Sequence, residues 1–213
     1  MVDFNRRYAP VYVAARQAFG SAGATFCVAQ KNRPGSEYRA TFENAIHMVD
    51  LLRWYCGGEP VEVTAHTAGD DPWQEDGTTA VIRFDTGNTG VLMAARTAGA
   101  WNEKLDAYGA GRSAEVQAPE SVSITVDGVT TTRTLSSESF GWATATDTLG
   151  FSAAVHHFLD RINDRRAPLT SGRDAVATQR LLEKILTSAG LPTHEQQGRQ
   201  WASHATNPVP QPA

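Results

Sequence analysis

The sequence predicts an α+β fold: a mostly antiparallel, open-faced β-sheet with helices packed on one of its faces. Residues 61–135 alternate between apolar and polar side chains, as the strands of an antiparallel sheet do, and these strands are neighbours along the chain. Helical periodicity is confined to the segments before and after them. Helices on one side leave the other face of the sheet open, so we expect homo-oligomerisation through that face.

The first part of the chain predicts two short strands and two helices. Residues 2–8 alternate as a half-buried strand, and Pro10 suits the first turn of a helix that stops at Gly20. Gly57 and Gly58 are a strong stop for the second helix. The remaining predicted elements are a strand over 24–29, a turn over 31–36 and a helix over 42–56.

The rest of the chain predicts a meander of strands closed by two helices. The hairpin turns are Asp85 to Asn88 and Asp127-Gly128. The strands are expected over 61–66, 79–84, 90–95, 104–108, 114–117, 121–126 and 129–135, and the helices over 148–164 and 174–189. We expect one domain over residues 1–190 and a disordered tail over 191–213, which is rich in Gln and Pro.

Composition excludes several classes of protein. The 213 residues carry a net charge of -4 with a pI near 5.8, which argues against nucleic-acid or anionic-membrane partners. No run approaches the ~18 apolar residues of a membrane-spanning helix, and the start of the chain does not resemble a secretory signal. Cys27 and Cys56 lack metal-ligand spacing and are expected to be buried, reduced thiols. We therefore expect a cytoplasmic protein without a metal site.

The leading candidate site is the pair Glu43 and His47 on the predicted 42–56 helix. Residues four apart on a helix are neighbours, so a carboxylate and an imidazole at this spacing can share a proton or a ligand hydroxyl. The same spacing also fits an exposed helix face with a weak side-chain contact. Asp50 follows one turn later as a candidate ligand-binding residue, and a structural ion pair with Arg53 is the alternative for it.

Four further residues are candidates for binding a substrate. Arg6 and Arg7 could bind a sugar or a carboxylate, although a structural role at a strand edge fits them as well. Tyr38 and Arg39 precede the candidate helix and could close over a ligand. Lys31 lies in the predicted turn before them, where a solvated loop is the simpler interpretation.

Several segments together resemble the C-terminal domain of the glucose–fructose oxidoreductase / inositol dehydrogenase (Gfo/Idh/MocA) family. The resemblance covers about residues 2–190, in order and at plausible spacing, and it implies the fold of a dihydrodipicolinate reductase-like C-terminal domain. The segments are residues 2–10 (Val-Asp-Phe-Asn-Arg-Arg-Tyr-Ala-Pro), 46–54 (Ile-His-Met-Val-Asp-Leu-Leu-Arg-Trp), 84–90 (Phe-Asp-Thr-Gly-Asn-Thr-Gly) and 158–162 (Phe-Leu-Asp-Arg-Ile).

The resemblance implies a sugar or polyol substrate bound between two domains, with hydride transfer to NAD or NADP. His47 would exchange the proton of the reacting hydroxyl, and Glu43, where the family usually has Asp, would orient that group. The chain has no Gly-x-Gly-x-x-Gly after a strand, and residues 109–114 come nearest but replace the third glycine by alanine. We therefore expect no cofactor binding by this chain alone; NAD(P) would require a Rossmann domain, which could be a separate subunit.

These observations predict the substrate-binding and oligomerisation half of an NAD(P)-dependent sugar or polyol oxidoreductase. Two alternatives stay open. A cofactor-independent epimerase, lyase or cyclase could reuse Glu43 and His47 for proton transfer. A non-catalytic binding or scaffold homo-oligomer could keep the fold without the chemistry.

Overall fold

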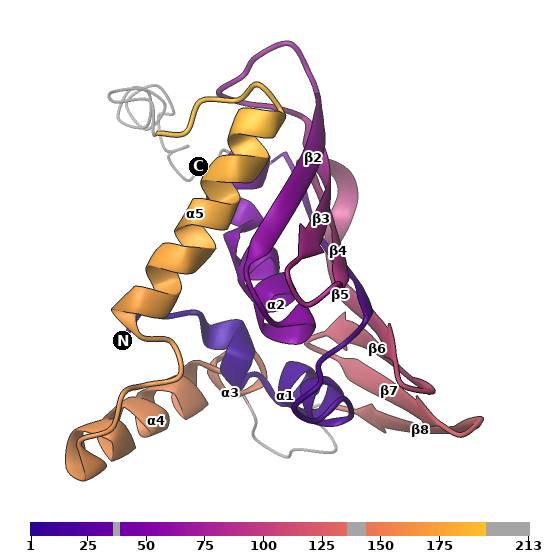
Figure 1. Ribbon diagram of the computed structural model, residues 1–213, viewed down its shortest axis with the longest axis vertical. Helices are drawn as coiled ribbons and strands as arrows, with labels where there is room; N and C mark the ends of the chain where they lie inside the picture. The colour runs from indigo at the N-terminus through magenta and orange to yellow at the C-terminus, as the bar shows by residue number, and fades with distance from the viewer. Residues whose placement is uncertain (36–38, 136–143, 195–213) are drawn as a thin grey trace, which may run out of the picture.

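A computed structural model describes residues 1–35, 39–135 and 144–194 of the chain (Figure 1). The candidate residue Tyr38 and all of the predicted tail beyond residue 194 lie outside these ranges.

One eight-stranded sheet forms the framework, in the order β2-β3-β4-β1-β5-β6-β7-β8. β1 and β4 are parallel neighbours, and every other neighbouring pair is antiparallel. The strands are β1 (Phe26–Pro34), β2 (Pro60–Ala68), β3 (Gly77–Phe84), β4 (Thr89–Ala95), β5 (Thr97–Gly109), β6 (Arg112–Ala118), β7 (Ser121–Val126) and β8 (Val129–Thr134). The predicted fold class is confirmed. The predicted meander is interrupted once, because β1 lies between β4 and β5.

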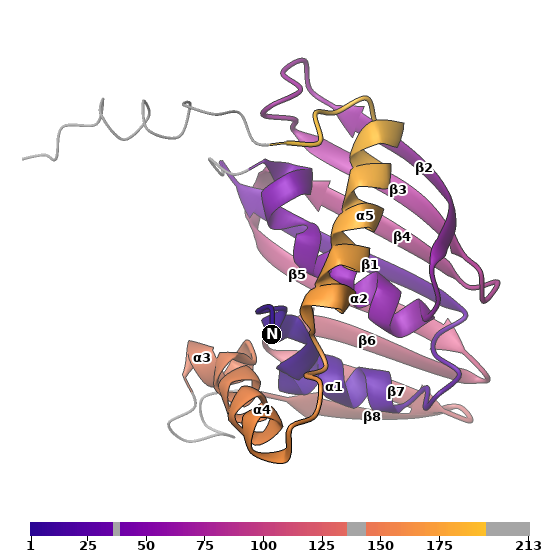
Figure 2. The same cartoon turned by 60° about the vertical axis from the view of Figure 1, so that its left-hand side comes forward.

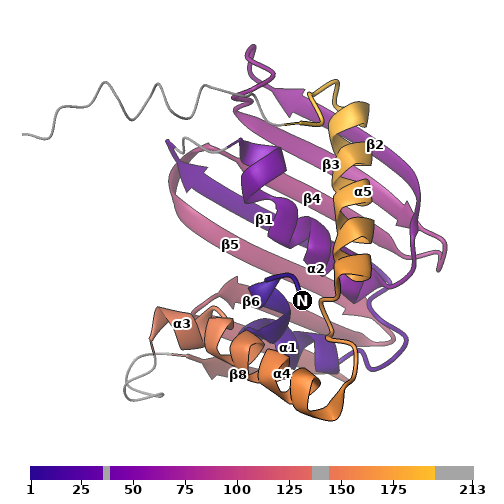
Figure 3. The same cartoon turned by 90° about the vertical axis from the view of Figure 1, so that its left-hand side faces the viewer.

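The helices gather on one face of the sheet, which Figure 1 shows nearly edge-on. α2 packs on β1 and β4, α5 packs on β2 and α2, and α1 packs on β6 and β7 (Figures 2 and 3). The helices are η1 (a 3-10 helix, Asn5–Tyr8), α1 (Pro10–Gln17), η2 (a π-helical turn, Ala40–Asn44), α2 (Ile46–Cys56), α3 (Ala145–Thr148), α4 (Phe151–Asp164) and α5 (Gly172–Ser188).

The core lies between the sheet and α2, and α5 encloses it further by packing on both α2 and β2. Side chains around most of the circumference of α2 are therefore buried, unlike those of an ordinary surface helix. Burying this apolar surface is the main favourable term in folding. The fully buried apolar side chains of the two helices are Met48, Val49, Leu51, Leu52, Tyr55, Cys56, Leu181, Leu182, Ile185 and Leu186.

The predicted strand over residues 2–8 is wrong. Phe4 to Tyr8 are buried consecutively instead of alternately, and Asn5–Tyr8 form the helix η1. The reason is that both Arg6 and Arg7 pair with buried carboxylates, and a strand would turn these adjacent side chains to opposite faces. The N-terminus is held instead near the start of α5, where the Val2 N–H donates to the Thr170 carbonyl at 2.8 Å.

The predicted turn over residues 31–36 is also wrong in its first half. β1 continues to Pro34 because β4 and β5 flank it, and Lys31 is aligned with Ala94 on one side and Glu103 on the other. A residue with a sheet partner on each side has its backbone hydrogen bonds satisfied, which outweighs local turn propensity. Lys31 is consequently buried at 5% exposure rather than solvated.

α4 lies away from the sheet and contacts η1 and α3. Gly150 allows this approach, because its φ is +88° and a Cβ there would lie 2.3 Å from the Asn5 carbonyl oxygen. The predicted apolar stripe of this helix is present but faces outward. Its exposed members are Phe151, Val155, Phe158, Leu159 and Ile162.

No helix of the described residues covers the second face of the sheet (Figure 1). Phe26, Val81 and Tyr108 are exposed apolar or aromatic side chains there, and Val28 and Val91 are half-buried between them. Towards β7 and β8 the same face becomes polar, with hydroxyl pairs such as Ser123 and Thr132 at 2.8 Å. None of the described helices is long and apolar enough to cross a membrane.

Candidate active site

The candidate helix begins differently from the regular helix predicted over 42–56. Residues 40–44 form the π-helical turn η2, and α2 starts at Ile46. In η2 the Arg39 carbonyl oxygen accepts hydrogen bonds from the N–H groups of both Glu43 and Asn44, at 3.3 and 3.2 Å. Single π-helical turns often occur at functional sites. Glu43 therefore lies on η2, whereas His47 lies on the first turn of α2.

Glu43 contacts the start of its own turn. Its Oε2 atom accepts a hydrogen bond from the Arg39 backbone N–H at 2.7 Å, so the carboxylate satisfies one of the donors that a helix start leaves unpaired. The contact fixes the position of Glu43 one turn before His47. The roles predicted for the pair in proton exchange stay predictions.

His47 is half-buried and neutral. Its Nδ1 atom is enclosed and has no hydrogen-bond partner among the described residues, and its ring meets the edge of Phe4 at a centroid distance of 6.4 Å. Burial, followed by the positive charges of Lys31 and Arg6, lowers the pKa of His47 to about 3, against a smaller opposing effect of Glu103. A neutral imidazole is the form that can accept a proton from a hydroxyl group.

Glu103 on β5 is the centre of the charges near His47. The side chain is fully buried, and Arg6 binds it bidentately, with Nε–Oε1 at 2.8 Å and Nη2–Oε2 at 2.9 Å. The Tyr12 hydroxyl donates to Oε1 at 2.9 Å, and Lys31 Nζ lies 3.5 Å from Oε2. Burial alone would raise the pKa of Glu103, but the hydrogen bonds and charge of Arg6 lower it to about 2. Glu103 therefore stays ionised at neutral pH.

Lys31 holds a buried ammonium group at the edge of this cluster. Burial lowers the pKa of Lys31 to about 8, and the neighbouring charge of Glu103 only partly offsets that effect. The Asn44 side chain donates to the Lys31 carbonyl oxygen at 3.3 Å, which joins η2 to β1. The position of Lys31 is thus tied to the turn that precedes His47.

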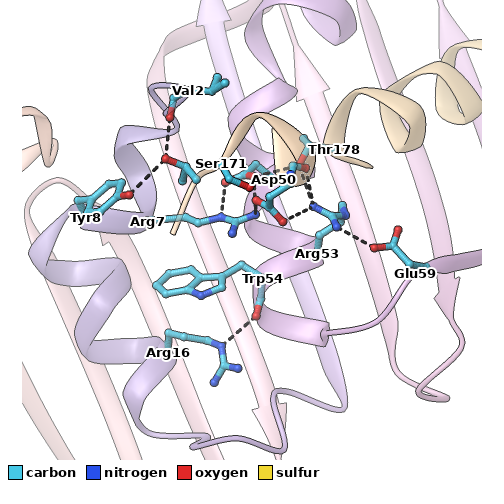
Figure 4. A network of polar contacts seen from close by, with 12 residues as sticks. Val2, Arg7, Tyr8, Arg16, Asp50, Arg53, Trp54, Glu59, Ser171 and Thr178 are labelled. Atoms are coloured by element: carbon cyan, nitrogen blue, oxygen red, sulfur yellow. Dashed lines mark hydrogen bonds and ion pairs between the residues drawn. The ribbon is translucent and has the colours of Figure 1, made fainter. Parts of the chain in front are cut away.

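Arg7 and Asp50 belong to a second network, shown in Figure 4. Arg7 binds both oxygens of Asp50, at 2.8 and 2.6 Å, and the Thr178 hydroxyl donates to Asp50 Oδ1 at 3.0 Å. Asp174 links Arg7 to Arg53. Its Oδ2 atom lies 2.9 Å from Arg7 Nη2, and its Oδ1 atom lies 3.2 Å from Arg53 Nη1. These contacts join η1, α2 and α5.

The predicted ion pair between Asp50 and Arg53 is replaced by these contacts. Arg53 binds Glu59 at 2.8 Å and Asp174, while Asp50 binds Arg7. Residues three apart on α2 can interact, but the buried partners from η1 and α5 satisfy more of the donors of each arginine. Arg7 and Asp50 were candidates for binding substrate; the structure places both in this network.

Arg39 is buried between two aromatic rings. Its guanidinium carbon lies 5.2 Å from the centroid of Phe42 and 5.4 Å from that of Trp73. The same group donates to the carbonyl oxygens of Pro192 and His194 at 2.8 and 2.9 Å. Arg39 thereby anchors the first residues of the segment predicted to be a disordered tail.

The sequence reasoning missed Glu103 and Tyr12, and for Lys31 it preferred a solvated loop. A signal for Lys31 and Glu103 was present. Lys31 continues the alternation of Cys27 and Ala29, and Glu103 continues that of Leu105 and Ala107, so both charged residues occupy positions on the apolar face of a strand. A charge at such a position requires a buried partner.

The described residues do not form a dinucleotide cradle. Residues 109–112 connect β5 to β6 as a tight hairpin turn, with positive φ at Ala110 and Gly111, and no helix follows them. A phosphate cradle requires the N-terminus of a helix after the glycine-rich turn. Among the described residues there is also no group of three or more His, Cys, Asp or Glu side chains that could hold a metal ion.

The Asp50 network predicts a large stability effect. Asp50→Asn would leave the buried Arg7 guanidinium without its main counter-charge, and breaking a buried pair in this way costs about 3 kcal/mol or more. We expect urea denaturation to show that loss. Glu62→Gln, which breaks the exposed Arg83 pair at 2.9 Å, should cost less than about 1 kcal/mol. Equal midpoints for the two variants would contradict the structural role of Asp50.

The lowered pKa of His47 predicts a specific acid sensitivity. Between the ordinary histidine pKa of 6.5 and the folded value of about 3, the unfolded chain binds a proton at this residue that the folded protein does not bind. Stability should therefore fall as the pH drops below 6.5, by about 1 kcal/mol per pH unit for this group. His47→Gln should lose less stability than the unmodified chain between pH 6.5 and 4.5 in chemical denaturation. Parallel pH profiles would show that His47 is not buried as described.

Comparison with known proteins supports the resemblance noted in the sequence. Residues 21–115 match the model of the GFO/IDH/MocA C-terminal domain. YceM of Salmonella typhimurium, an oxidoreductase by name, is 26% identical over 203 residues, covering 89% of this chain and 61% of YceM.

Solved structures share the fold. UDP-N-acetylglucosamine 3-dehydrogenase GnnA from Acidithiobacillus ferrooxidans has a TM-score of 0.75 at 20% identity, covering 88% of this chain and 60% of GnnA. An oxidoreductase from Agrobacterium radiobacter, solved with NAD+, L-tartaric acid and magnesium, has a TM-score of 0.74 at 20% identity, covering 89% and 62%. The chain thus spans about three fifths of the length of these relatives. Residues 21–115 of this protein thus carry the sequence of a Gfo/Idh/MocA C-terminal domain, and the chain is homologous to the C-terminal parts of dehydrogenases.

Proposed function

We propose that this domain is the substrate-binding and oligomerisation half of an NAD(P)-dependent sugar or polyol oxidoreductase. The observation that carries the proposal is the neutral, half-buried imidazole of His47 on α2, within a domain of this family. GnnA, whose fold this chain shares, is by name a dehydrogenase of a nucleotide sugar. The structure of the Agrobacterium protein contains NAD+ and a hydroxy acid.

The proposed role of this chain is to bind the substrate and move its proton. Oxidation of an alcohol releases a hydride and a proton, and a neutral imidazole can accept the proton from the hydroxyl. His47 is assigned that step, and Glu43 is assigned the orientation of the reacting or a neighbouring hydroxyl. Because the described residues contain no dinucleotide cradle, the acceptor of the hydride is assigned to a nucleotide-binding domain outside the described residues.

The outward stripe of α4 supports a partner of this kind. Its five exposed apolar side chains form a surface that soluble domains usually cover. α4 contacts η1, so this helix lies beside the first residues of the chain. We assign it to contact with the nucleotide-binding domain, whether this is part of a longer chain or a separate subunit.

The open face of the sheet supports homo-oligomerisation. The apolar side chains of Phe26, Val81 and Tyr108 are exposed in its centre, while the edge near β8 is polar. A second copy of the same face would bury this apolar centre and keep the polar edge hydrated, which is the composition of a homodimer interface.

A second function is supported by one specific observation. The neutral imidazole of His47 can accept a proton, and the ammonium group of Lys31 can donate one. The two groups lie in the same domain, and the charge of Lys31 contributes to the lowered pKa of His47. A cofactor-independent epimerase or lyase needs such a pair and no nicotinamide. Turnover of a sugar by this chain without any nucleotide, lost in His47→Ala, would favour this function over the first.

The proposed division of labour predicts the behaviour of the cofactor. NADH and NADPH should show no saturable binding to the 213-residue chain when their fluorescence is titrated, and saturable binding would overturn the division. With a nucleotide-binding domain supplied, His47→Ala should lower kcat/KM for sugar oxidation by roughly 10²–10⁴-fold, the usual contribution of a general base. His66→Ala, an exposed histidine on β2, is the matched control and should keep the activity.

The proposed oligomer predicts a charge-sensitive interface. Val81→Lys places a charge in the apolar centre of the open face, so sedimentation should show dissociation into monomers. Thr132→Lys, on the same face but at the polar edge on β8, should leave the oligomer intact. A protein that is monomeric before substitution, or an oligomer that Val81→Lys leaves unchanged, would contradict an interface through this face.

A further inference from the structure

Lys31 is the charged side chain near His47 whose donors are least used. Glu103 receives strong hydrogen bonds from Arg6 and Tyr12 at 2.8 to 2.9 Å, which occupy both of its oxygens. The contact of the Lys31 ammonium with Oε2 is longer, at 3.5 Å. An ammonium group has three donors, so Lys31 keeps donor capacity that Glu103 does not satisfy.

The local structure holds that ammonium group in place. β1 lies between β4 and β5, and the side chain of Lys31 projects from the helix-covered face together with Cys27 and Ala29. The hydrogen bond from the Asn44 side chain to the Lys31 carbonyl ties the strand to η2. A lysine fixed in this way has lost most of its side-chain freedom on folding, so binding a ligand orders it little further.

The electrostatic field at His47 is positive. Lys31 and Arg6 each act on the imidazole more strongly than Glu103, the negative charge that opposes them. Arg33 adds a further positive charge near Lys31, and Asp3 faces Arg6 from the chain terminus. Because these groups are largely withdrawn from water, their charges are weakly screened. A negatively charged group of a ligand is favoured beside His47 over a neutral hydroxyl.

We propose that Lys31 binds the carboxylate of an acidic substrate whose hydroxyl group lies against His47, which makes the substrate a sugar acid or a related hydroxy acid. Arg6 contributes charge but is held by Glu103, so Lys31 makes the direct contact. The inference rests on the proposed function, because it names the substrate class of the same site. The inference predicts that the site prefers acidic sugars to neutral sugars and polyols.

The test compares probes that differ in one carboxylate. Glucuronate and glucose are titrated into the 213-residue chain, with binding followed by calorimetry and by the NMR signals of His47. A hydrogen bond to a charged group is among the stronger ones in proteins, so glucuronate should bind at least about tenfold more tightly than glucose. Glucose 6-phosphate serves as a third probe, for a site that prefers any anion.

Three variants separate charge from structure. Lys31→Met removes the ammonium while Arg6 and Tyr12 still bind Glu103, and it should lower glucuronate affinity about tenfold without changing that of glucose. Lys31→Arg keeps the charge and should restore part of the preference. Lys104→Met removes a lysine from the opposite face of the neighbouring strand β5 and should change neither affinity. Thermal unfolding of each variant confirms that it is folded.

Each outcome has a separate meaning. Equal binding of glucose and glucuronate, a preference that survives Lys31→Met, or tighter binding of the phosphate probe would overturn the carboxylate inference but leave the proposed function intact. Binding of neither sugar would overturn both. Glucuronate binding that depends on Lys31, combined with no oxidation when a nucleotide-binding domain is supplied, would overturn the oxidoreductase function and leave the acid-binding site.

Discussion

Two adjacent arginines neutralise two carboxylates that the fold buries completely, and the arrangement of the domain depends on these pairs. Arg6 binds Glu103 on β5, and Arg7 binds Asp50 on α2. A buried ion that loses its partner costs several kcal/mol, so neither carboxylate could remain in the core without its arginine. Because the arginines are consecutive, η1 must lie where both carboxylates can be reached.

The same pairs determine the chemistry near His47. Arg6 makes the short contact with Glu103, and Lys31 makes a longer one. The positive charges of Arg6 and Lys31 both act on the imidazole of His47. Burial, together with these two charges, keeps His47 neutral, as a proton acceptor requires, in a positive field that an acidic ligand would complement. Stability and site electrostatics thus arise from one set of contacts. A substitution at Arg6 would change both, whereas one at Lys31 mainly changes the field.

Two apolar surfaces of the described part of the chain are exposed. One is the outward stripe of α4, and the other is the centre of the open sheet face around Val81. They lie on different sides of the molecule, because α4 is placed beside η1 on the side of the sheet that the helices cover (Figures 1 and 3). Two separate surfaces are what the proposed function requires, one for the proposed nucleotide-binding domain at α4 and one for the proposed second copy at the sheet.

The sequence by itself determined the fold class, the strands of the meander, the helix that carries His47 and the resemblance to the family. These features follow from local periodicity and turn residues, which are visible within ten to twenty positions. Only the tertiary structure decided that residues 5–8 are helical, that Lys31 is buried, and which carboxylate each arginine binds. Arg6 and Glu103 are 97 positions apart, and Arg7 and Asp50 are 43 apart. The cost of burying a charge is offset only by a partner that the fold brings near, so no local pattern can identify that partner.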